Sequence, residues 1–148
     1  MSCEPTEYDS DLMYEKILLY KGRNFRYFSA ARKVSTFSSS GEYRHGAVLV
    51  NGSAIVNSSS NKNRLCSFGT RFRGENAGIA TLHAELGCIL GIDRSITEGA
   101  RVYVCRVGKN GDFRLSKPCP MCTAAMKYVG IKRVYWTIDN NNCAMGRL

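Results

Sequence analysis

The stretch SKPCPMCTAAM, residues 116–126, places Cys119 and Cys122 three residues apart, directly after Pro118. Apolar residues then recur at helical spacing, so we expect a helix over residues 119–130. Side chains three apart in a helix lie on one face, so both sulfur atoms can reach one metal ion. The start of a helix also favours thiolate, the form used in zinc binding and in redox chemistry. The pair alone fits a redox motif, a structural zinc site or a catalytic metal site.

A second helical pattern covers residues 81–90, where we expect Thr81 to cap the helix and Gly91 to stop it. It contains His83-Ala84-Glu85. His83 can supply a third ligand through nitrogen, whereas Glu85, two residues further on, is placed to face an open fourth position. Three protein ligands plus water are typical of catalytic zinc, and four protein ligands of structural zinc. The sequence therefore favours a catalytic zinc site.

The two other interpretations of the cysteine pair are weaker. A thioredoxin-like redox motif should follow the first strand of its domain, and this pair lies late in the chain. A closed four-ligand site needs one more ligand. The other histidine is His45, and Cys66, Cys88 and Cys105 show no paired spacing.

Length and composition are those of one globular domain, which we expect to span residues 1–148. No apolar run approaches the ~18 residues of a membrane span, and we expect neither such a span nor a secretory signal. Seven cysteines form an odd number without framework spacing. We therefore expect an intracellular protein, cytoplasmic or nuclear, that is not secreted.

The charge is unevenly distributed along the chain. Residues 1–15 hold five acidic and no basic residues, an acidic segment that can be flexible. Residues 16–148 hold 21 basic and seven acidic residues, a net charge of +14. Such a surface favours anionic partners such as nucleotides or single-stranded nucleic acid, although it can also be simply solvated.

The order of expected elements is that of an α/β domain with one mixed sheet. Asn51-Gly52 is a strong hairpin signal between two β-branched runs. The expected elements are a helix at 24–35, a hairpin at 45–57, a helix at 81–90, a strand at 101–107, a helix at 119–130 and a strand at 132–138.

An H-x-E motif followed by P-C-x-x-C resembles the cytidine deaminase-like superfamily of zinc enzymes. The resemblance covers residues 24–138, where GAVLV, HAE, PCPMC and GIKRVYW occur in the family's order. The superfamily includes deoxycytidylate, tRNA adenosine and polynucleotide cytidine deaminases. It implies a three-layer α/β fold with a mixed sheet of about four to five strands and helices on both faces.

The resemblance also implies roles for individual residues. Zn2+ held by His83, Cys119 and Cys122 would activate a water molecule, and Glu85 would transfer protons. Backbone groups at Ala84 and near Pro118 would anchor the substrate. Asn61 follows the second strand, where family members bind the sugar, although a loop asparagine that stabilises its own turn is an equal alternative.

Two departures from the family bear on substrate and assembly. Lys117 precedes Pro118, where tRNA adenosine deaminases usually have glutamate and polynucleotide cytidine deaminases serine or threonine. Only ten residues follow Ile138. A four-stranded minimal core, or completion by a partner chain in a homo-oligomer, is the expectation.

The loop at residues 61–80 interleaves arginines with aromatic residues, a composition suited to phosphate contact and base stacking. We therefore expect cytosine to be deaminated to uracil in single-stranded DNA or RNA, with four cations as substrate contacts. Free (deoxy)cytidylate, adenosine in tRNA or other RNA, and a non-catalytic zinc-containing nucleic-acid-binding module are the alternatives. The four cations are Arg64, Arg71, Arg73 and Lys117.

Overall fold

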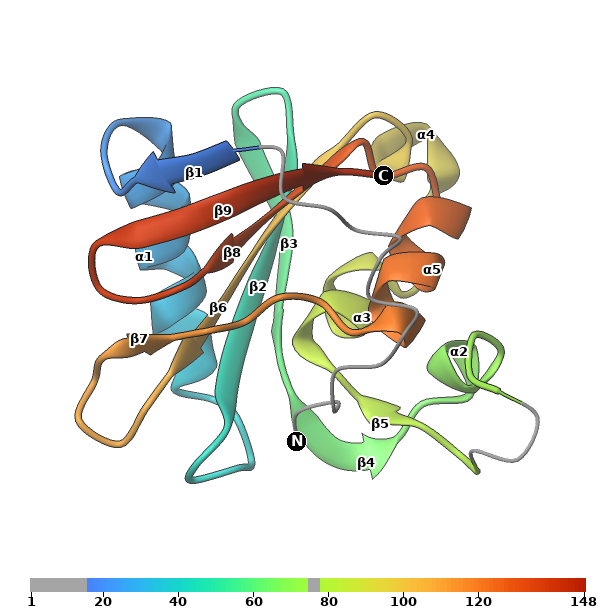
Figure 1. Ribbon diagram of the computed structural model, residues 1–148. Helices are drawn as coiled ribbons and strands as arrows, with labels where there is room; N and C mark the ends of the chain where they lie inside the picture. The colour runs from blue at the N-terminus through green and yellow to red at the C-terminus, as the bar shows by residue number, and fades with distance from the viewer. Residues whose placement is uncertain (1–15, 75–77) are drawn as a thin grey trace.

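A mixed seven-stranded β-sheet forms the centre of the protein (Figure 1). The strands are β1 Lys16–Leu19, β2 Arg44–Asn51, β3 Ala54–Ser60, β6 Arg101–Val107, β7 Phe113–Arg114, β8 Arg133–Thr137 and β9 Asn142–Arg147. Their order is β1-β9-β8-β6-β2-β3, with β7 paired to β6. β6 and β8 run parallel, and the other neighbours are antiparallel. The computed structural model describes residues 16–74 and 78–148, so the acidic segment at residues 1–15 lies outside the described part.

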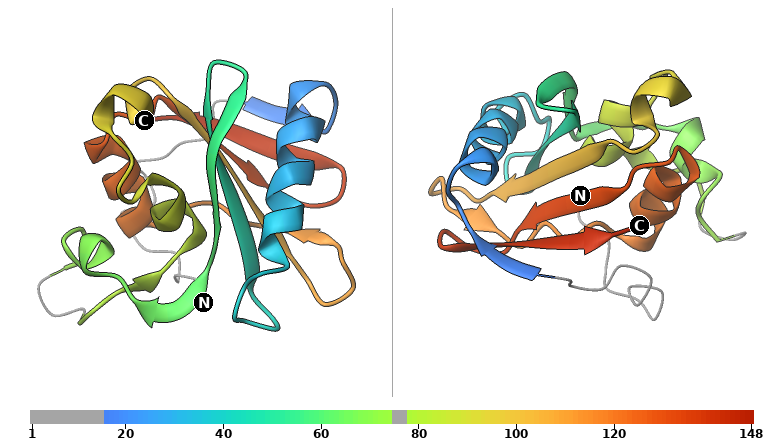
Figure 2. Two further views of the ribbon diagram at one scale, coloured as in Figure 1. Left: turned by 180° about the vertical axis from the view of Figure 1, so that it is seen from behind. Right: turned by 90° about the horizontal axis from the view of Figure 1, so that it is seen from above.

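Helices cover both faces of this sheet, which gives three layers (Figure 2). α1 (Arg23–Ser35) packs on one face, where its Tyr27 and Phe28 join Tyr103 in a buried cluster. α3 (Ala84–Ile89) and α5 (Pro120–Tyr128) pack on the other face. The predicted α/β fold is confirmed.

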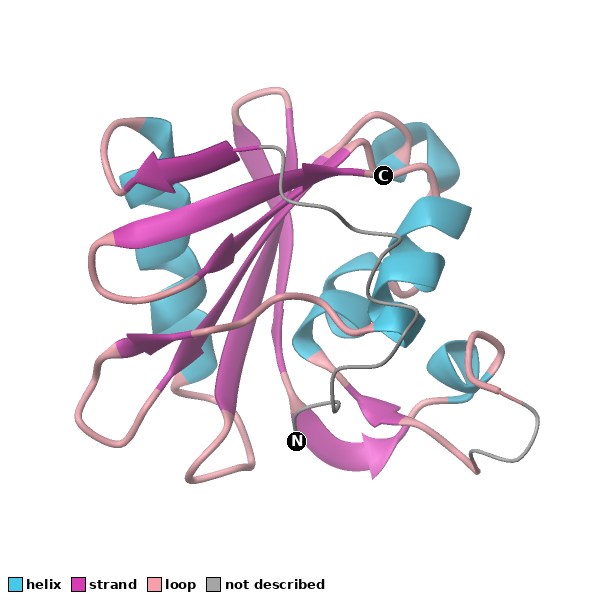
Figure 3. Ribbon diagram, in the orientation of Figure 1, coloured by secondary structure: helices cyan, strands magenta, loops and turns pink. Residues whose placement is uncertain are grey.

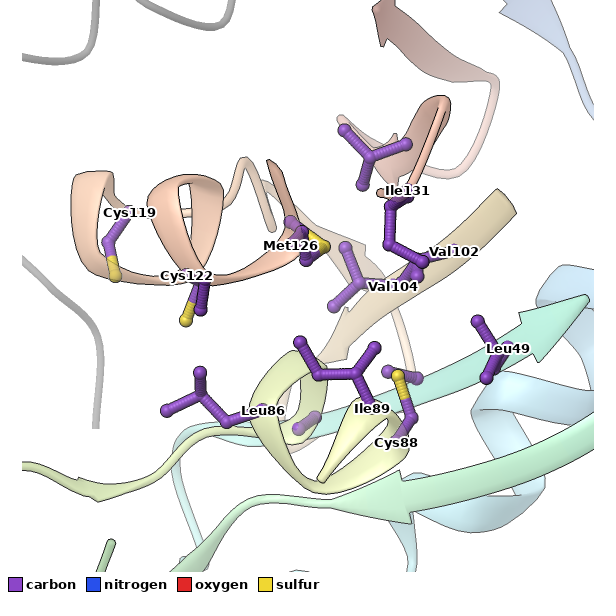
Figure 4. Packing of buried hydrophobic residues seen from close by; sticks show 14 of the residues in the cluster. Leu49, Leu86, Cys88, Ile89, Val102, Val104, Cys119, Cys122, Met126 and Ile131 are labelled. Carbon is purple, nitrogen blue, oxygen red and sulfur yellow. The ribbon is translucent and has the colours of Figure 1, made fainter. Parts of the chain in front are cut away.

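Side chains of α3 and α5 interlock with the sheet in the larger core (Figure 4). Leu86 and Ile89 of α3 face Cys122 and Met126 of α5, and Val102 and Val104 of β6 complete the cluster from the sheet. Because these side chains are essentially fully buried, they fix how the two helices lie against each other.

Four shorter elements, two helices and two strands, lie outside the seven-stranded sheet and the three helices that pack on it (Figure 3). β4 (Lys62–Leu65) and β5 (Thr81–Leu82) form a separate two-stranded sheet. α2 (Ser67–Thr70) follows β4, and α4 (Arg94–Thr97) precedes β6. None of the helices in the described residues is long and apolar enough to cross a membrane.

Most elements expected from the sequence are present with shifts of one or two residues. β2 and β3 form the expected hairpin, and Gly52 has a positive φ of 64° in its turn. β7 pairs with the end of β6, so the segment before the cysteine pair forms a second hairpin, which was not among the expected elements.

The predicted start of the second motif helix is wrong. Thr81 does not cap it, because its backbone pairs with Leu65 in the small sheet. The helix begins at Ala84, and His83 takes the N-cap position with an extended backbone. Gly91 has a φ of 75°, in keeping with a helix stop at this glycine.

The prediction of a four-stranded minimal core is also wrong, and the prediction of a homo-oligomer stays a prediction. β9 pairs antiparallel with β8, and β1 from the other end of the sequence pairs with β9. The turn between β8 and β9 is held by Asp139, whose carboxylate accepts the backbone N–H groups of Asn141 and Asn142. Tyr20 donates its hydroxyl to carbonyl oxygens of the same turn. The sheet is therefore extended to seven strands from within the chain.

Gly46 is the point of closest approach between β2 and α1. A β-carbon at Gly46 would lie 2.0 Å from the carbonyl oxygen of Ala31. We expect Gly46→Ala to lower the free energy of unfolding by about 2–3 kcal/mol, measured by urea denaturation, because α1 must move away. Gly41→Ala is the matched control, since nothing lies within 4 Å of the position that its new methyl group would take, and a change above about 0.5 kcal/mol is not expected. Equal effects of the two substitutions would contradict the steric explanation.

Candidate active site

The candidate site forms where the N-termini of α3 and α5 meet. His83 is the N-cap residue of α3, and Cys119 is the N-cap residue of α5. Both have extended backbones, and the carbonyl of each accepts an N–H from its own helix, at Gly87 and at Thr123. Cys122 lies in the first turn of α5 and is fully buried. The three side chains are therefore positioned by the starts of two helices that pack against each other.

The three candidate ligand atoms lie close together. Nδ1 of His83 is 3.8 Å from Sγ of Cys119 and 3.3 Å from Sγ of Cys122. All three atoms lie within 4.8 Å of one another. Tetrahedral zinc, with bonds of about 2.0 Å to nitrogen and about 2.3 Å to sulfur, holds nitrogen and sulfur ligands about 3.5 Å apart. The cluster therefore fits Zn2+.

Among residues 16–74 and 78–148, no other group of three or more His, Cys, Asp or Glu side chains is close enough to hold a metal ion. The set has two sulfur donors and one nitrogen donor, a combination that suits zinc. Three protein ligands are the number found in catalytic zinc sites. The role of each residue as a ligand stays a prediction.

Glu85 lies beside this cluster in the first turn of α3 and is only 5% exposed. Burial raises the pKa of its carboxyl group, and the charge of His83 and a hydrogen bond with Cys122 oppose this rise. A carboxyl group with a raised pKa can both accept and donate a proton near neutral pH. Glu85 thus has the chemistry of a proton-transfer residue, and this role stays a prediction.

The six cysteines of the described residues are all free and buried. Cys88 donates its thiol to the carbonyl of Glu85, and burial raises the pKa of Cys88 strongly. Burial likewise raises the pKa of Cys105 to about 12. These two thiols are therefore protonated and act as small packing residues in the core.

Asn61 directly follows β3 and is almost fully buried. Its side-chain oxygen accepts the backbone N–H of His45 and the hydroxyl of Ser38, and its amide donates to the carbonyl of Tyr43. It therefore fixes the loop before β2. Asn61 and His83 also line one cavity of about 190 Å³, so the side chain stands where a bound sugar could be contacted.

His45 is held neutral next to Asn61. Burial lowers the pKa of His45 to about 4, and the nearby charges of Arg106 and His83 lower it further. Its Nδ1 lies 3.2 Å from the carbonyl of Tyr43, so this nitrogen carries the proton. At neutral pH the imidazole adds no positive charge to the surroundings of the zinc cluster.

The predicted substrate contacts are not all gathered at this cavity. Arg64 is exposed on β4, close to the cavity. Arg71 packs instead against the rings of Phe68, Phe72 and Tyr128, with its guanidinium 5.3–5.9 Å from their centroids. Arg73 is exposed beyond α2.

Ala84 and Pro118 are buried on the two sides of the cluster. Ala84 is the first residue of α3, and its N–H has no partner inside that helix. Pro118 has no N–H and offers only its carbonyl. Lys117, which directly precedes Pro118 in the sequence, is half-buried.

Six residues that line the cavity were not named as site residues from the sequence: Ser39, Ser40, Lys62, Asn63, Thr81 and Leu82. The two serines lie in a serine-rich run that the sequence presents as an ordinary connection. The sequence offered one indication that Lys62 lines the cavity, namely its position directly after Asn61. Folding of the chain brings Ser39 and Ser40, which are distant in sequence, to the same cavity as His83.

Comparison with known families agrees with the geometry. No curated protein matches the chain significantly. The family model described as "Cytidine and deoxycytidylate deaminase zinc-binding region" matches residues 23–138, which is most of the chain and includes both helix starts. The resemblance seen in the sequence is thereby confirmed, and the chain belongs to the cytidine and deoxycytidylate deaminase family of zinc-binding domains.

Proposed function

We propose that the protein is a hydrolytic deaminase that converts cytosine to uracil in single-stranded nucleic acid. The family and the His/Cys/Cys cluster support zinc-dependent deaminase chemistry in general, on a nucleotide or nucleic acid. The observation that carries the catalytic assignment is the buried carboxyl group of Glu85, two residues after His83 at the start of α3. A purely structural zinc site has no use for such a group.

The reaction exchanges the exocyclic amine of the base for oxygen from water, which releases ammonia. His83, Cys119 and Cys122 would hold zinc, which when bound supplies a Lewis acid that makes water acidic enough to lose a proton near neutral pH. Glu85 accepts that proton and passes it to the ring nitrogen. Once the water oxygen has bonded to the ring carbon, Glu85 takes the second proton of that water and delivers it to the departing amine, which leaves as ammonia when the C–N bond breaks. The closed packing around Glu85 keeps bulk water from competing for these protons.

The preference for cytosine rests on Lys117, since tRNA adenosine deaminases usually carry glutamate at this position. The preference for nucleic acid rests on the net charge of +14 over residues 16–148 and on the exposed Arg64 and Arg73. Free deoxycytidylate is the second candidate, because Phe68, Phe72 and Arg71 are occupied in packing and are not offered as a stacking platform.

A substrate panel tests the proposal. We expect zinc-loaded protein to release ammonia from cytosine in single-stranded DNA or RNA, with dCMP, cytidine and tRNA as comparison substrates. Activity on a polynucleotide should fall by more than about tenfold between about 50 and about 200 mM NaCl, because several phosphates are contacted. Activity on dCMP that hardly depends on salt would instead support the second candidate. No ammonia from any substrate would refute deamination.

A further inference from the structure

Three arginines form a row across neighbouring strands of the large sheet. Arg101 of β6 lies directly opposite Arg133 of β8, and Arg133 lies directly opposite Arg147 of β9. Neighbouring strands are about 4.8 Å apart, so the row extends over about 10 Å. Like charges that lie directly opposite each other destabilise a sheet. The row is therefore unfavourable for folding alone and favourable for holding an anion.

The row lies on the face of the sheet that carries α1. Each of its arginines is two residues away from a member of the buried cluster under α1, and side chains two apart in a strand share a face. The helices that hold the candidate zinc ligands, α3 and α5, pack on the other face (Figure 2). The row is therefore separate from the candidate active site. The cluster members in question are Tyr103, Tyr135 and Met145.

α1 extends this basic surface beyond the row. The guanidinium carbon of Arg26 lies 5.4 Å from the ring centroid of Tyr27, and that of Arg101 lies 5.9 Å from the same centroid. One buried ring therefore contacts a cation of α1 and a cation of the row. Arg101 also donates a hydrogen bond to the carbonyl of Gly52, which fixes the position of its side chain. The four arginines thus form one surface.

The start of α1 is also arranged against the usual electrostatic preference. Its N-cap residue, Gly22, makes no side-chain hydrogen bond, and the first turn holds no acidic residue. Arg23 and Arg26 are exposed there and lie three residues apart on one side of the helix. A helix start carries a partial positive charge, so it disfavours cations and favours anions. This second feature of the same surface also points to an anionic ligand.

No carboxylate compensates Arg26, Arg101 or Arg133 within the described residues. α1, β6, β8 and β9 contain no aspartate or glutamate. The two ion pairs found in residues 16–74 and 78–148 join other residues. In that part of the chain, the buried Nε of Arg133 also has no hydrogen-bond partner. Guanidinium groups bind phosphate oxygens in pairs, so phosphate suits these groups.

We propose that Arg26, Arg101, Arg133 and Arg147 form a second contact surface for single-stranded nucleic acid, on the face of the sheet opposite the zinc cluster. A row that extends over about 10 Å fits a chain of phosphates better than one phosphate group. Such a surface holds the backbone without reading its sequence. The identity of the polyanion rests on the proposed function, which supplies nucleic acid as the substrate. The surface retains a long strand while its target base reaches the zinc cluster.

Binding of a fluorescent oligothymidine to the zinc-loaded full chain tests this surface. The probe contains no cytidine, so no turnover occurs. We expect the double variant Arg133→Gln/Arg147→Gln to bind at least about fivefold more weakly at about 100 mM NaCl. The slope of log Kd against log[NaCl] should become shallower by about 1.4, because each lost contact to a single-strand phosphate removes about 0.7. Arg94→Gln, an exposed arginine that pairs with Glu98, is the matched control and should change neither quantity.

Activity on a long strand that contains one cytidine gives a second readout. The double variant should raise KM by a factor similar to its loss of affinity and leave kcat unchanged, because the row lies on the other face from Glu85. Its urea midpoint of unfolding should not fall, since the substitutions relieve repulsion between like charges. A purely structural role of the row would lower that midpoint and leave the salt slope unchanged.

Four outcomes decide the proposal. Unchanged affinity and salt slope in the double variant would overturn it, and so would an equal loss in Arg94→Gln. Displacement of the probe by polyglutamate as effectively as by unlabelled oligothymidine would assign the surface to an acidic polypeptide and overturn the nucleic-acid assignment. Arg147→Gln alone should flatten the salt slope by about 0.7, and because Arg147 is exposed this variant decides the matter even if Arg133→Gln disturbs folding. Failure of the proposed function would appear separately, as absence of ammonia release by the unsubstituted protein.

Discussion

Glu85→Gln is expected to lower kcat by about 10²–10⁴-fold, because a positioned proton-transfer group contributes a rate increase of this size. Glutamine keeps the size and most of the hydrogen bonds of glutamate, but it cannot take a proton from water or return one to the leaving amine. The change should lie almost wholly in kcat, since the cations and Asn61 remain. The measurement is ammonia release under saturating substrate.

Two controls separate this effect from misfolding. Glu98→Gln removes an exposed carboxylate whose ion pair with Arg94 lies at the surface, and it should leave kcat unchanged. Zinc content of the Glu85 variant should remain that of the parent. Its free energy of unfolding should not fall, since the substitution removes a carboxyl group whose burial is costly. Full activity of Glu85→Gln would refute the assigned proton transfer.

Cys122→Ser is expected to abolish stoichiometric zinc binding and, with it, detectable deamination. Cys122 is fully buried and its sulfur lies 3.3 Å from Nδ1 of His83, so the variant loses a thiolate donor from the centre of the set. Metal analysis after dialysis should show well below one zinc per chain. A ligand present at about 100 times its Kd stabilises a protein by about 2.7 kcal/mol, so a chelator should destabilise the parent by a similar amount and the variant hardly at all.

Cys105→Ser is the matched control for this experiment. Cys105 is also fully buried, but it faces α1 on the opposite side of the sheet. Both substitutions bury a hydroxyl, so both can lower stability. Only the Cys122 variant should lose zinc and the response to chelator. Zinc loss in both variants, or in neither, would contradict the assignment of Cys122 as a ligand.

The sequence predicts the α/β frame well where hydrophobic periodicity and turn residues agree. Asn51-Gly52 predicts the β2–β3 hairpin, and apolar residues at helical spacing predict α1 and α5. The H-x-E and P-C-x-x-C motifs, each placed at the start of a helix, predict that the histidine and the two cysteines come together. The structure places His83, Cys119 and Cys122 together as these motifs imply.

What could not be predicted depends on contacts between distant parts of the chain. β9 contains Asn142 and Gly146, which disfavour strands locally, and it forms because β8 and β1 flank it. Thr81 would cap a helix in isolation, but its pairing with Leu65 prevails. Arg71 carries no local sign that its guanidinium group would lie over the rings of Phe68 in α2 and Tyr128 in α5.

The position of two candidate ligands at helix N-caps links the metal centre to the rest of the molecule. The spacing of His83 and Cys119 is set by the relative placement of α3 and α5, and that placement is set by buried residues such as Leu86 and Met126. Affinity for zinc is therefore partly a property of the apolar core. Substitutions far from any ligand can alter metal retention by shifting one helix against the other, so metal occupancy reports on the integrity of the whole fold.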